Sequence, residues 1–154
     1  MEAIPESSLI EIHSGWTYGG GTWIQSHASF VISQNEGLIF DCRSKVSVSN
    51  GGVWGFFGGF EAEILFQVNE SGDLLGLCRT ESQTQIPLAF SGDLEEWHTY
   101  RIQAEATIVH FFVDGIPVGQ IETHIPVDRQ MQARLDRVSL GEDAILYVDC
   151  VSVY

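Results

Sequence analysis

Apolar and polar residues alternate with a period of two in short runs along the whole chain. The clearest run covers residues 60–68, where every second position carries Phe, Ala, Ile, Phe or Val. Because successive side chains of a β-strand point to opposite faces, this pattern predicts a strand with one buried face. The other face, which we expect to be solvated, includes Glu61 and Glu63.

The same alternation recurs at intervals of roughly 8–12 residues, with turn-forming sequences between the runs. The runs cover residues 26–33, 38–42, 60–68, 74–79, 85–90, 97–105, 107–113, 117–124, 133–140 and 144–154. Asp114-Gly115 is the strongest turn signal, since both central residues of a type I′ hairpin need positive φ. About ten to twelve short strands indicate an all-β fold, a sandwich of two antiparallel sheets.

Length and charge narrow the class of protein further. The 154 residues suit a single domain spanning 1–154, and an apolar content of 44% is enough for a substantial core. The net charge of −14 repels nucleic-acid phosphates and anionic membranes, so we expect neither as a partner. No apolar run reaches the roughly 20 residues of a membrane-spanning helix, and no membrane insertion is expected.

The cysteines and the N-terminal segment bear on the compartment. The cysteines are Cys42, Cys78 and Cys150. Because an odd number cannot form a complete disulfide framework, buried thiols and a single Cys42–Cys150 bridge both stay open. Residues 1–15 carry glutamates and no Lys or Arg, unlike a secretory signal. An extracellular or cell-surface location is expected if the chain belongs to a larger exported protein.

Four motifs in a fixed order resemble a known superfamily. They are Gly37-Leu-Ile-Phe-Asp41, Phe56-Phe-Gly-Gly-Phe-Glu-Ala-Glu-Ile64, the stretch 97–115, and the closing Leu146-Tyr-Val-Asp-Cys-Val-Ser-Val-Tyr154. Together they resemble concanavalin-A-like sandwiches, above all glycoside hydrolase family 16 and the laminin-G-like lectin modules. The resemblance implies a jelly-roll sandwich with a carbohydrate as its partner.

Catalysis is the point at which the chain departs from family 16. Retaining enzymes of that family carry a strand with Glu-x-Asp-x-Glu or a close variant, whose outer carboxylates lie about 5–5.5 Å apart. The corresponding runs, 74–80 and 85–90, contain no carboxylate. Glu61 and Glu63 share one strand pattern, but we interpret them as a solvated, structural face. We therefore expect no catalytic residue, and an enzyme with a displaced catalytic pair is the less favoured alternative.

Two glycine-dense segments carry the candidate binding residues. The first contains Trp16, Tyr18 and Trp23, and the second surrounds Trp54. Glycine lets the backbone approach a ligand, and a flat aromatic ring can stack on the apolar face of a sugar. We predict that these aromatic residues lie in loops and bind a carbohydrate. The alternative is that their rings plug the ends of the sandwich.

One metal site follows from the resemblance. In family 16 the Asp of the closing strand ligates calcium, together with backbone carbonyls that include one from a glycine before an early strand. Asp149 matches this Asp and Gly37 is the best match for the glycine, so the resemblance implies a structural calcium ion. Calcium takes six to eight oxygen ligands, and only one carboxylate is identifiable. An Asp149 that hydrogen-bonds to neighbouring backbone is the alternative.

The favoured hypothesis is a non-catalytic carbohydrate-binding or adhesion module that uses its loop aromatic residues. A structural or protein-interaction module of a larger surface protein, with no sugar ligand, is the second hypothesis. Binding to a panel of glycans separates the two.

Overall fold

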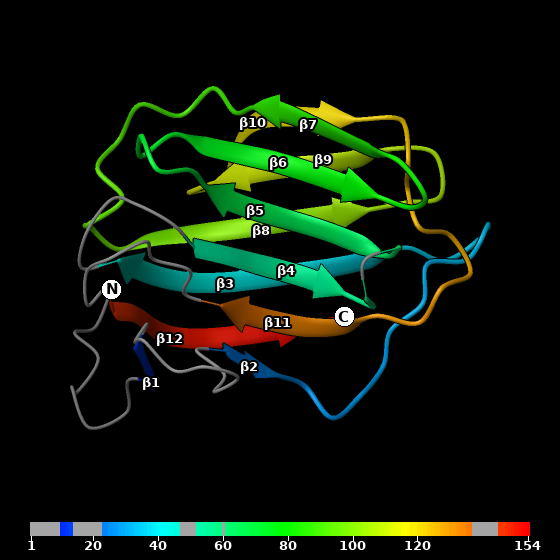
Figure 1. Cartoon of the computed structure of the whole chain (residues 1–154), viewed down its shortest axis with the longest axis horizontal. Helices are drawn as coiled ribbons and strands as arrows, with labels where there is room; N and C mark the ends of the chain where they lie inside the picture. Colours follow the sequence, from blue (N-terminus) through cyan, green and yellow to red (C-terminus); the bar gives the residue numbers. More distant parts are fainter. Residues whose placement is uncertain (1–9, 14–22, 47–51, 60, 137–144) are drawn as a thin grey trace.

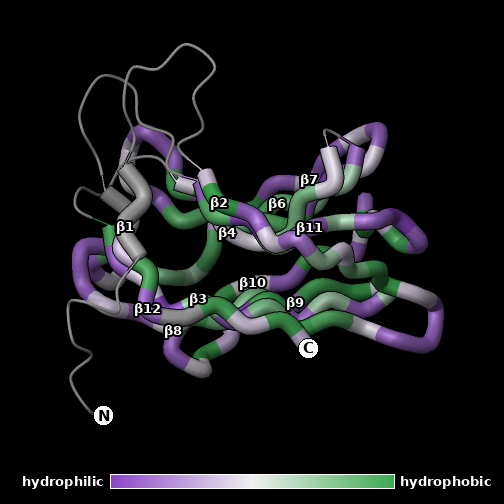
Figure 2. Tube along the Cα trace, turned by 90° about the horizontal axis from the view of Figure 1, so that it is seen from below, coloured by the Kyte–Doolittle hydropathy of each residue, from purple (hydrophilic) through white to green (hydrophobic). Residues whose placement is uncertain are grey.

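The computed structural model describes residues 10–13, 23–46, 52–59, 61–136 and 145–154 of the chain. These residues form twelve strands and no helix, and the strands make two antiparallel sheets of six (Figure 1). Seen from below, the two sheets are separate layers, one above the other (Figure 2). The prediction of an all-β sandwich is confirmed. Within the described residues no helix is long and apolar enough to cross a membrane.

We call one layer the β3 sheet, and its strand order is β1-β12-β3-β8-β9-β10. Its strands are β1 (Ile10–His13), β12 (Ile145–Val153), β3 (Leu38–Val46), β8 (His98–Ala104), β9 (Val109–Val113) and β10 (Ile116–Ile121). The edge strand β1 pairs only with the first part of β12, from Ile145 to Val148. Among the described residues, positions 150–153 of β12 pair only with β3.

We call the other layer the β4 sheet, and its strand order is β2-β11-β4-β5-β6-β7. Its strands are β2 (Trp23–Gln25), β11 (Gln132–Asp136), β4 (Gly52–Phe57), β5 (Glu63–Val68), β6 (Leu74–Arg79) and β7 (Gln83–Pro87). Figure 1 shows this order from β7 at the top to β2 at the bottom. The edge strand β2 has only three residues, all exposed.

The predicted hairpin turn at Asp114-Gly115 is confirmed. The φ angles of Asp114 and Gly115 are 51° and 79°, both in the left-handed region that a type I′ turn requires. Val113 and Ile116 pair directly on either side of the turn. The Asp114 carboxylate also accepts a hydrogen bond from the backbone N–H of Thr99 at 2.9 Å, which ties the turn to β8.

Aromatic rings from both sheets fill the core between the layers. Ala62, Ile64 and Phe66 are buried there, as the alternation predicted, and Phe60 of the same run lies outside the described residues. The ring of Phe66 meets that of Phe111 from the other sheet edge to face, with 5.1 Å between ring centres. Such aromatic pairs add about 0.5–1.5 kcal/mol to the effect of burial alone.

Cys42 lies on β3 and Cys150 on the neighbouring strand β12, whereas Cys78 lies on β6 of the other sheet. Cys42 and Cys78 are buried, and burial raises the pKa of the Cys78 thiol to about 12. Val151 of β12 pairs with Cys42, and Cys150 pairs with Arg43. The position of the Cys150 side chain lies outside the described part of the chain, so buried thiols and a Cys42–Cys150 bridge remain the two alternatives.

Candidate functional site

The outer face of the β4 sheet collects polar and aromatic side chains from all six strands. Because side chains alternate along each strand, the residues next to the core residues point away from the β3 sheet. Register places the following side chains on this outer face: Trp23, Gln25, Val53, Phe57, Glu63, Leu65, Gln67, Leu75, Leu77, Arg79, Gln83, Gln85, Pro87, Gln132, Arg134 and Asp136. We refer to this set as the outer face.

Trp23 is the aromatic residue of this face that is most open to solvent, with 42% of its surface exposed. The guanidinium carbon of Arg134 lies 4.6 Å from the centre of its ring and 4.2 Å from the centre of the Phe57 ring. One cation therefore contacts two rings, which is favourable by roughly 0.5–2 kcal/mol per ring. The contact holds the indole in one orientation before any ligand arrives.

The glycine in the middle of β4 determines what surrounds Arg134. Gly55 lies directly opposite Arg134 on one side and Leu65 on the other. Its φ is 148°, and a Cβ at this position would lie 2.3 Å from the carbonyl oxygen of Ile64. No larger residue fits without displacing the backbone of β5. The position between Arg134 and Leu65 is consequently bare of side-chain atoms.

Glu63 is the buried carboxylate of the outer face. Only 6% of its surface is exposed, so the prediction that it lies on a solvated face was wrong. Burial raises the pKa of Glu63, and the charges of Arg79 and Arg134 partly offset that rise. Side chains on neighbouring strands of the packed sheet account for this burial. The sequence pattern of a single strand carries no information about them.

The contact between Glu63 and Arg79 is an ion pair without a hydrogen bond. The Nε of Arg79 lies 3.2 Å from Oε2 of Glu63. However, Nε and Nη2 of Arg79 both donate to the amide oxygen of Gln83, at 3.1 and 2.5 Å. Oε2 of Glu63 is therefore buried with no hydrogen-bond donor, and Nε of Arg134 is also buried without an acceptor.

The carboxylates of the described residues do not form a catalytic pair on this face. Glu61 lies before β5 begins and is exposed, with its Oε2 3.6 Å from Arg129, whereas Glu63 is buried within β5. Glu63 and Asp136 both lie on the outer face, but β4 separates their strands. Their Cα atoms are roughly 16 Å apart at about 4.8 Å per strand and 3.3 Å per residue. A retaining glycosidase needs its two carboxyl groups about 5–5.5 Å apart.

The structure separates the predicted aromatic residues. Trp54 lies in β4 and is 1% exposed, so its placement in a binding loop was wrong. Its ring meets that of Tyr100 from the β3 sheet at 4.8 Å between centres. Trp23 is exposed, as a binding residue must be. Trp16 and Tyr18 lie outside the described residues.

The burial of Trp54 has a local cause. Trp54 and Phe56 are two positions apart in β4, so both side chains point to the same face of the strand and pack against the core. The glycines around Trp54 predict a loop, because glycine is common where the backbone turns. In this strand they instead permit close packing between layers.

The two residues of the predicted calcium site lie far apart. Asp149 accepts a hydrogen bond from Nη1 of Arg43 at 3.1 Å. Its neighbour Cys150 pairs with Arg43, and Gly37 precedes Arg43 by six positions in the sequence. At about 3.3 Å per residue, Asp149 and Gly37 are roughly 20 Å apart. Among the described residues no group of three or more His, Cys, Asp or Glu could hold a metal ion. Calcium binding through Asp149 stays a prediction.

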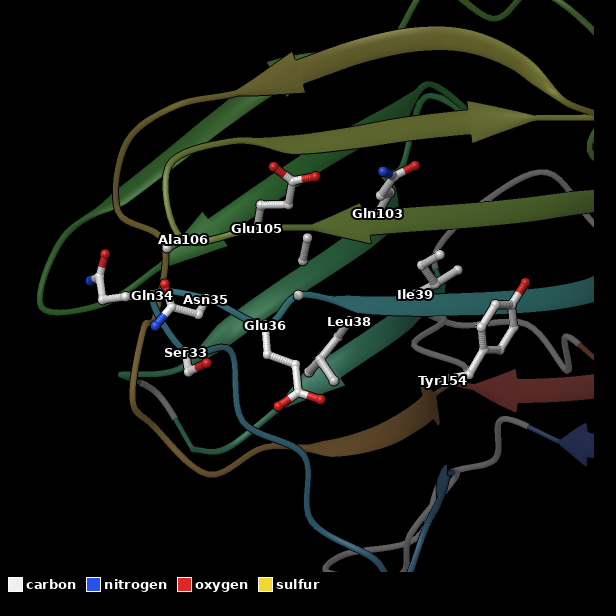
Figure 3. A pocket seen from close by; sticks show the side chains of 12 residues that line it. Ser33, Gln34, Asn35, Glu36, Leu38, Ile39, Gln103, Glu105, Ala106 and Tyr154 are labelled. Atoms are coloured by element: carbon white, nitrogen blue, oxygen red, sulfur yellow. The ribbon is translucent and has the colours of Figure 1, made fainter.

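A polar hollow of about 400 Å³ lies beside Gly37, at one end of β3 and β8 (Figure 3). In Figure 3 the carboxylates of Glu36 and Glu105 point to opposite sides of the β3 ribbon. They therefore do not converge on a shared ligand. Tyr154, also at the border of the hollow, donates a hydrogen bond to the carboxylate of Asp41 at 2.7 Å.

A second group of cations and rings lies on the outer side of the β3 sheet. The Nζ of Lys45 is 5.2 Å from the centre of the Trp97 ring and 5.1 Å from that of the Tyr147 ring. Arg43 also lies over Trp97, at 4.9 Å. This group has chemistry similar to that of Arg134 and Trp23 but lies on the opposite layer. Substitutions in it are therefore matched controls for substitutions at Arg134 and Trp23.

Sequence reasoning missed Arg134, Phe57 and Gln132 as parts of this face. Trp23 and Arg134 lie on different strands that pair only in the folded sheet. The alternation in the run 133–140 predicted a strand, but it did not indicate which ring Arg134 would meet. Only the strand order of the sheet supplies that information.

Comparison with solved structures defines the class of fold. A β-1,3-glucanase from Mycobacterium marinum is similar with a TM-score of 0.61 and 19% identity, over 95% of this chain and 74% of its own. A structure reported with the endo-acting O-glycanases of the human gut microbiota has a TM-score of 0.70 and 12% identity, over 96% and 80%. The binding domain of botulinum neurotoxin DC in complex with SialylT has a TM-score of 0.62 and 11% identity, over 95% and 38%.

These likenesses show that the chain has the concanavalin-A-like jelly-roll fold, as its motifs implied. The chain spans 33% of the length of a similar botulinum neurotoxin type C structure, at a TM-score of 0.57 and 13% identity. No family model matches the sequence, and no curated protein does. The comparisons thereby define the fold class. The structural features that bear on function lie on the outer face.

Proposed function

We propose that the protein is a non-catalytic carbohydrate-binding module whose ligand lies on the outer face and stacks on Trp23. The observation that carries the proposal is the exposed indole of Trp23, which Arg134 holds from one side. A sugar ring has an apolar C–H face that a flat aromatic ring covers, while nearby polar groups bond to its hydroxyls. Because Arg134 orders the indole in advance, less conformational entropy is lost when a ligand binds.

Polar groups around Trp23 suit sugar hydroxyls. Gln25 lies on the same strand, and Asp136 pairs with Trp23 directly. Gln132 and Arg134 lie on β11 beside them. Nη2 of Arg134 donates to Oδ2 of Asp136 at 3.3 Å, so these two groups would offer a sugar their remaining donors and acceptors, beside the amides of Gln25 and Gln132. These groups would determine specificity, whereas stacking supplies affinity.

The comparisons support this proposal at the level of fold. Structures with the same fold include a glucanase and a toxin binding domain in complex with SialylT, so this sandwich accommodates carbohydrate chemistry in other proteins. The separation of Glu63 from Asp136 argues for binding without hydrolysis. A carbohydrate ligand without turnover is the function that the outer face supports best.

A glycan array with the wild-type protein and two variants tests the proposal. We expect the wild type to bind at least one glycan and Trp23→Ala to weaken that binding roughly 5- to 150-fold, the range of about 1–3 kcal/mol for stacking. Trp97→Ala, which removes an aromatic ring from the opposite layer, is the matched control and should bind like the wild type. Equal binding by Trp23→Ala would refute the proposed site. Binding to no glycan would favour a protein-interaction module instead.

A further inference from the structure

The sandwich is open along one edge, between β12 of the β3 sheet and β2 and β11 of the β4 sheet. A cavity of about 400 Å³ lies in this opening. Most of its lining is apolar and includes Ile24, Phe30, Leu135, Val148, Val151 and Val153. Leu135 and Val148 at its floor belong to the buried core. The cavity therefore leads from solvent to core side chains.

Strands β12 and β2, from the two layers, border the opening. Among the described residues, β1 pairs with β12 only from Ile145 to Val148. On the other layer β2 contributes only three residues, Trp23–Gln25. Ile24 and Val151, which line the cavity from the two layers, are 38% and 36% exposed. Apolar side chains left open in this way mark a place where a ligand gains from burial.

The cavity adjoins the proposed sugar site across a single strand. Side chains alternate along β2, so Trp23 lies on the outer face with Arg134, while Ile24 pairs with the core residue Leu135 and lines the cavity. Within the part of the chain that the structure describes, β2 is the edge of its sheet, so no described strand of that sheet separates Trp23 from the cavity mouth. A ligand on Trp23 can pass around this edge.

We propose that this cavity takes an apolar group attached to the sugar that stacks on Trp23, such as an alkyl or aryl aglycone. The proposal rests on the proposed function, since it assumes a sugar at Trp23. A volume of about 400 Å³ falls within the roughly 300–1,000 Å³ of small-molecule sites. Gln25, Ser26, Asp149 and Ser152 also line the cavity and supply polar groups where the sugar would join its apolar substituent.

Two glycosides that differ only in their apolar group test the proposal. Methyl and octyl β-D-glucoside are titrated into the protein below the micelle concentration of the octyl compound, and Kd is measured by ligand-observed NMR. We expect octyl glucoside to bind at least tenfold more tightly, because burial of each CH₂ contributes up to about 0.8 kcal/mol. Ile24→Asp and, separately, Val151→Asp should abolish this advantage. Ile116→Asp is the matched control, since Ile116 is 65% exposed on β10, outside the cavity lining, and should keep it.

The possible outcomes distinguish a failure of the proposed cavity from a failure of the proposed sugar site at Trp23. Equal affinity for the two glucosides, no binding of either, or an advantage that survives in both aspartate variants would overturn the proposal. Tight binding of octyl glucoside that Trp23→Ala does not weaken would leave the cavity as an apolar site but reject the sugar site at Trp23. Thermal melting of each variant verifies that it is folded before its Kd is compared.

Discussion

The guanidinium carbon of Arg134 lies 4.6 Å from the centre of the Trp23 ring, so a cation on β11 holds the exposed indole on β2. Trp23 pairs with Asp136, two residues beyond Arg134, and the cation therefore reaches the ring diagonally across the two strands. The same guanidinium contacts Phe57 on β4 and connects three strands through one side chain. The orientation of the proposed binding residue thus depends on a residue that does not itself stack on the sugar.

Arg134→Ala should weaken glycan binding about three- to tenfold without abolishing it. Loss of the cation frees the indole to adopt other rotamers, and the roughly 0.5–2 kcal/mol of each cation–π contact is lost. Isothermal titration with a glycan identified on the array measures the effect. Lys45→Ala, which removes a cation from Trp97 on the opposite layer, is the control. If both variants bind like the wild type, Arg134 does not orient Trp23.

Trp54→Ala should destabilise the protein strongly, and Trp23→Ala should hardly change its stability. Trp54 is buried against Phe66 and Tyr100, so its removal leaves a cavity that costs about 3–5 kcal/mol. Trp23 is exposed, and its variant should melt close to the wild type because it loses mainly the contact with Arg134. Thermal or urea unfolding of the two variants checks this directly. A large loss of stability in Trp23→Ala would mean that this ring is part of the core.

The difference in stability between Glu63→Gln and the wild type should depend on pH. Burial raises the pKa of Glu63, so the folded state binds the proton more tightly than the unfolded state does. Stability of the wild type therefore falls as pH rises from the ordinary value of a glutamate through the raised folded value. The neutral amide of the variant lacks this dependence. The Tm of Glu63→Gln relative to the wild type should thus increase as pH rises from about 4 through the raised pKa of Glu63.

Glu61→Gln is the control for this titration, because Glu61 is an exposed carboxylate just before the same strand. Its Tm should follow that of the wild type across the pH range. A Tm difference for Glu63→Gln that is independent of pH would show that the carboxylate ionises in the folded state as it does in the unfolded chain.

Calcium should raise the Tm of the wild type if Asp149 is a ligand, since a ligand that binds only the folded state stabilises it by mass action. Asp149→Ala should remove the response. Because Asp149 also pairs with Arg43, Arg43→Ala is the control for loss of that ion pair alone. A wild-type Tm that is independent of calcium would end the metal hypothesis, and a response that survives in Asp149→Ala would assign the ion to other residues.

No reducing ends should be released from β-1,3, β-1,4 or mixed-linkage glucans. Strands β6 and β7 carry no carboxylate, and Glu63 has no second carboxylate among the described residues of the outer face at the distance that retaining hydrolysis needs. A reducing-sugar assay measures this. Release that the double variant Glu61→Gln, Glu63→Gln abolishes would establish an enzyme with a displaced pair.

The sequence by itself determined those features that depend on neighbours along the chain. The period of two in 60–68 identified Ala62, Ile64 and Phe66 as core residues, because a strand can bury only one face against a single layer. The turn at Asp114-Gly115 followed from the φ angles that its two residues tolerate. Both are local properties, and both were confirmed.

Only the tertiary structure decided where Trp54, Glu63 and Trp23 lie. Glycines around Trp54 indicated a loop, but in a strand between two layers they allow its ring to reach Tyr100. The alternation along one strand predicted a solvated Glu63, but Arg79 and other neighbours on the packed sheet bury it. Trp23 meets Arg134 because β2 and β11 are adjacent in the sheet although far apart in the sequence. Burial and cross-strand contacts depend on strand order and layer packing. The alternation along one strand carries no information about either.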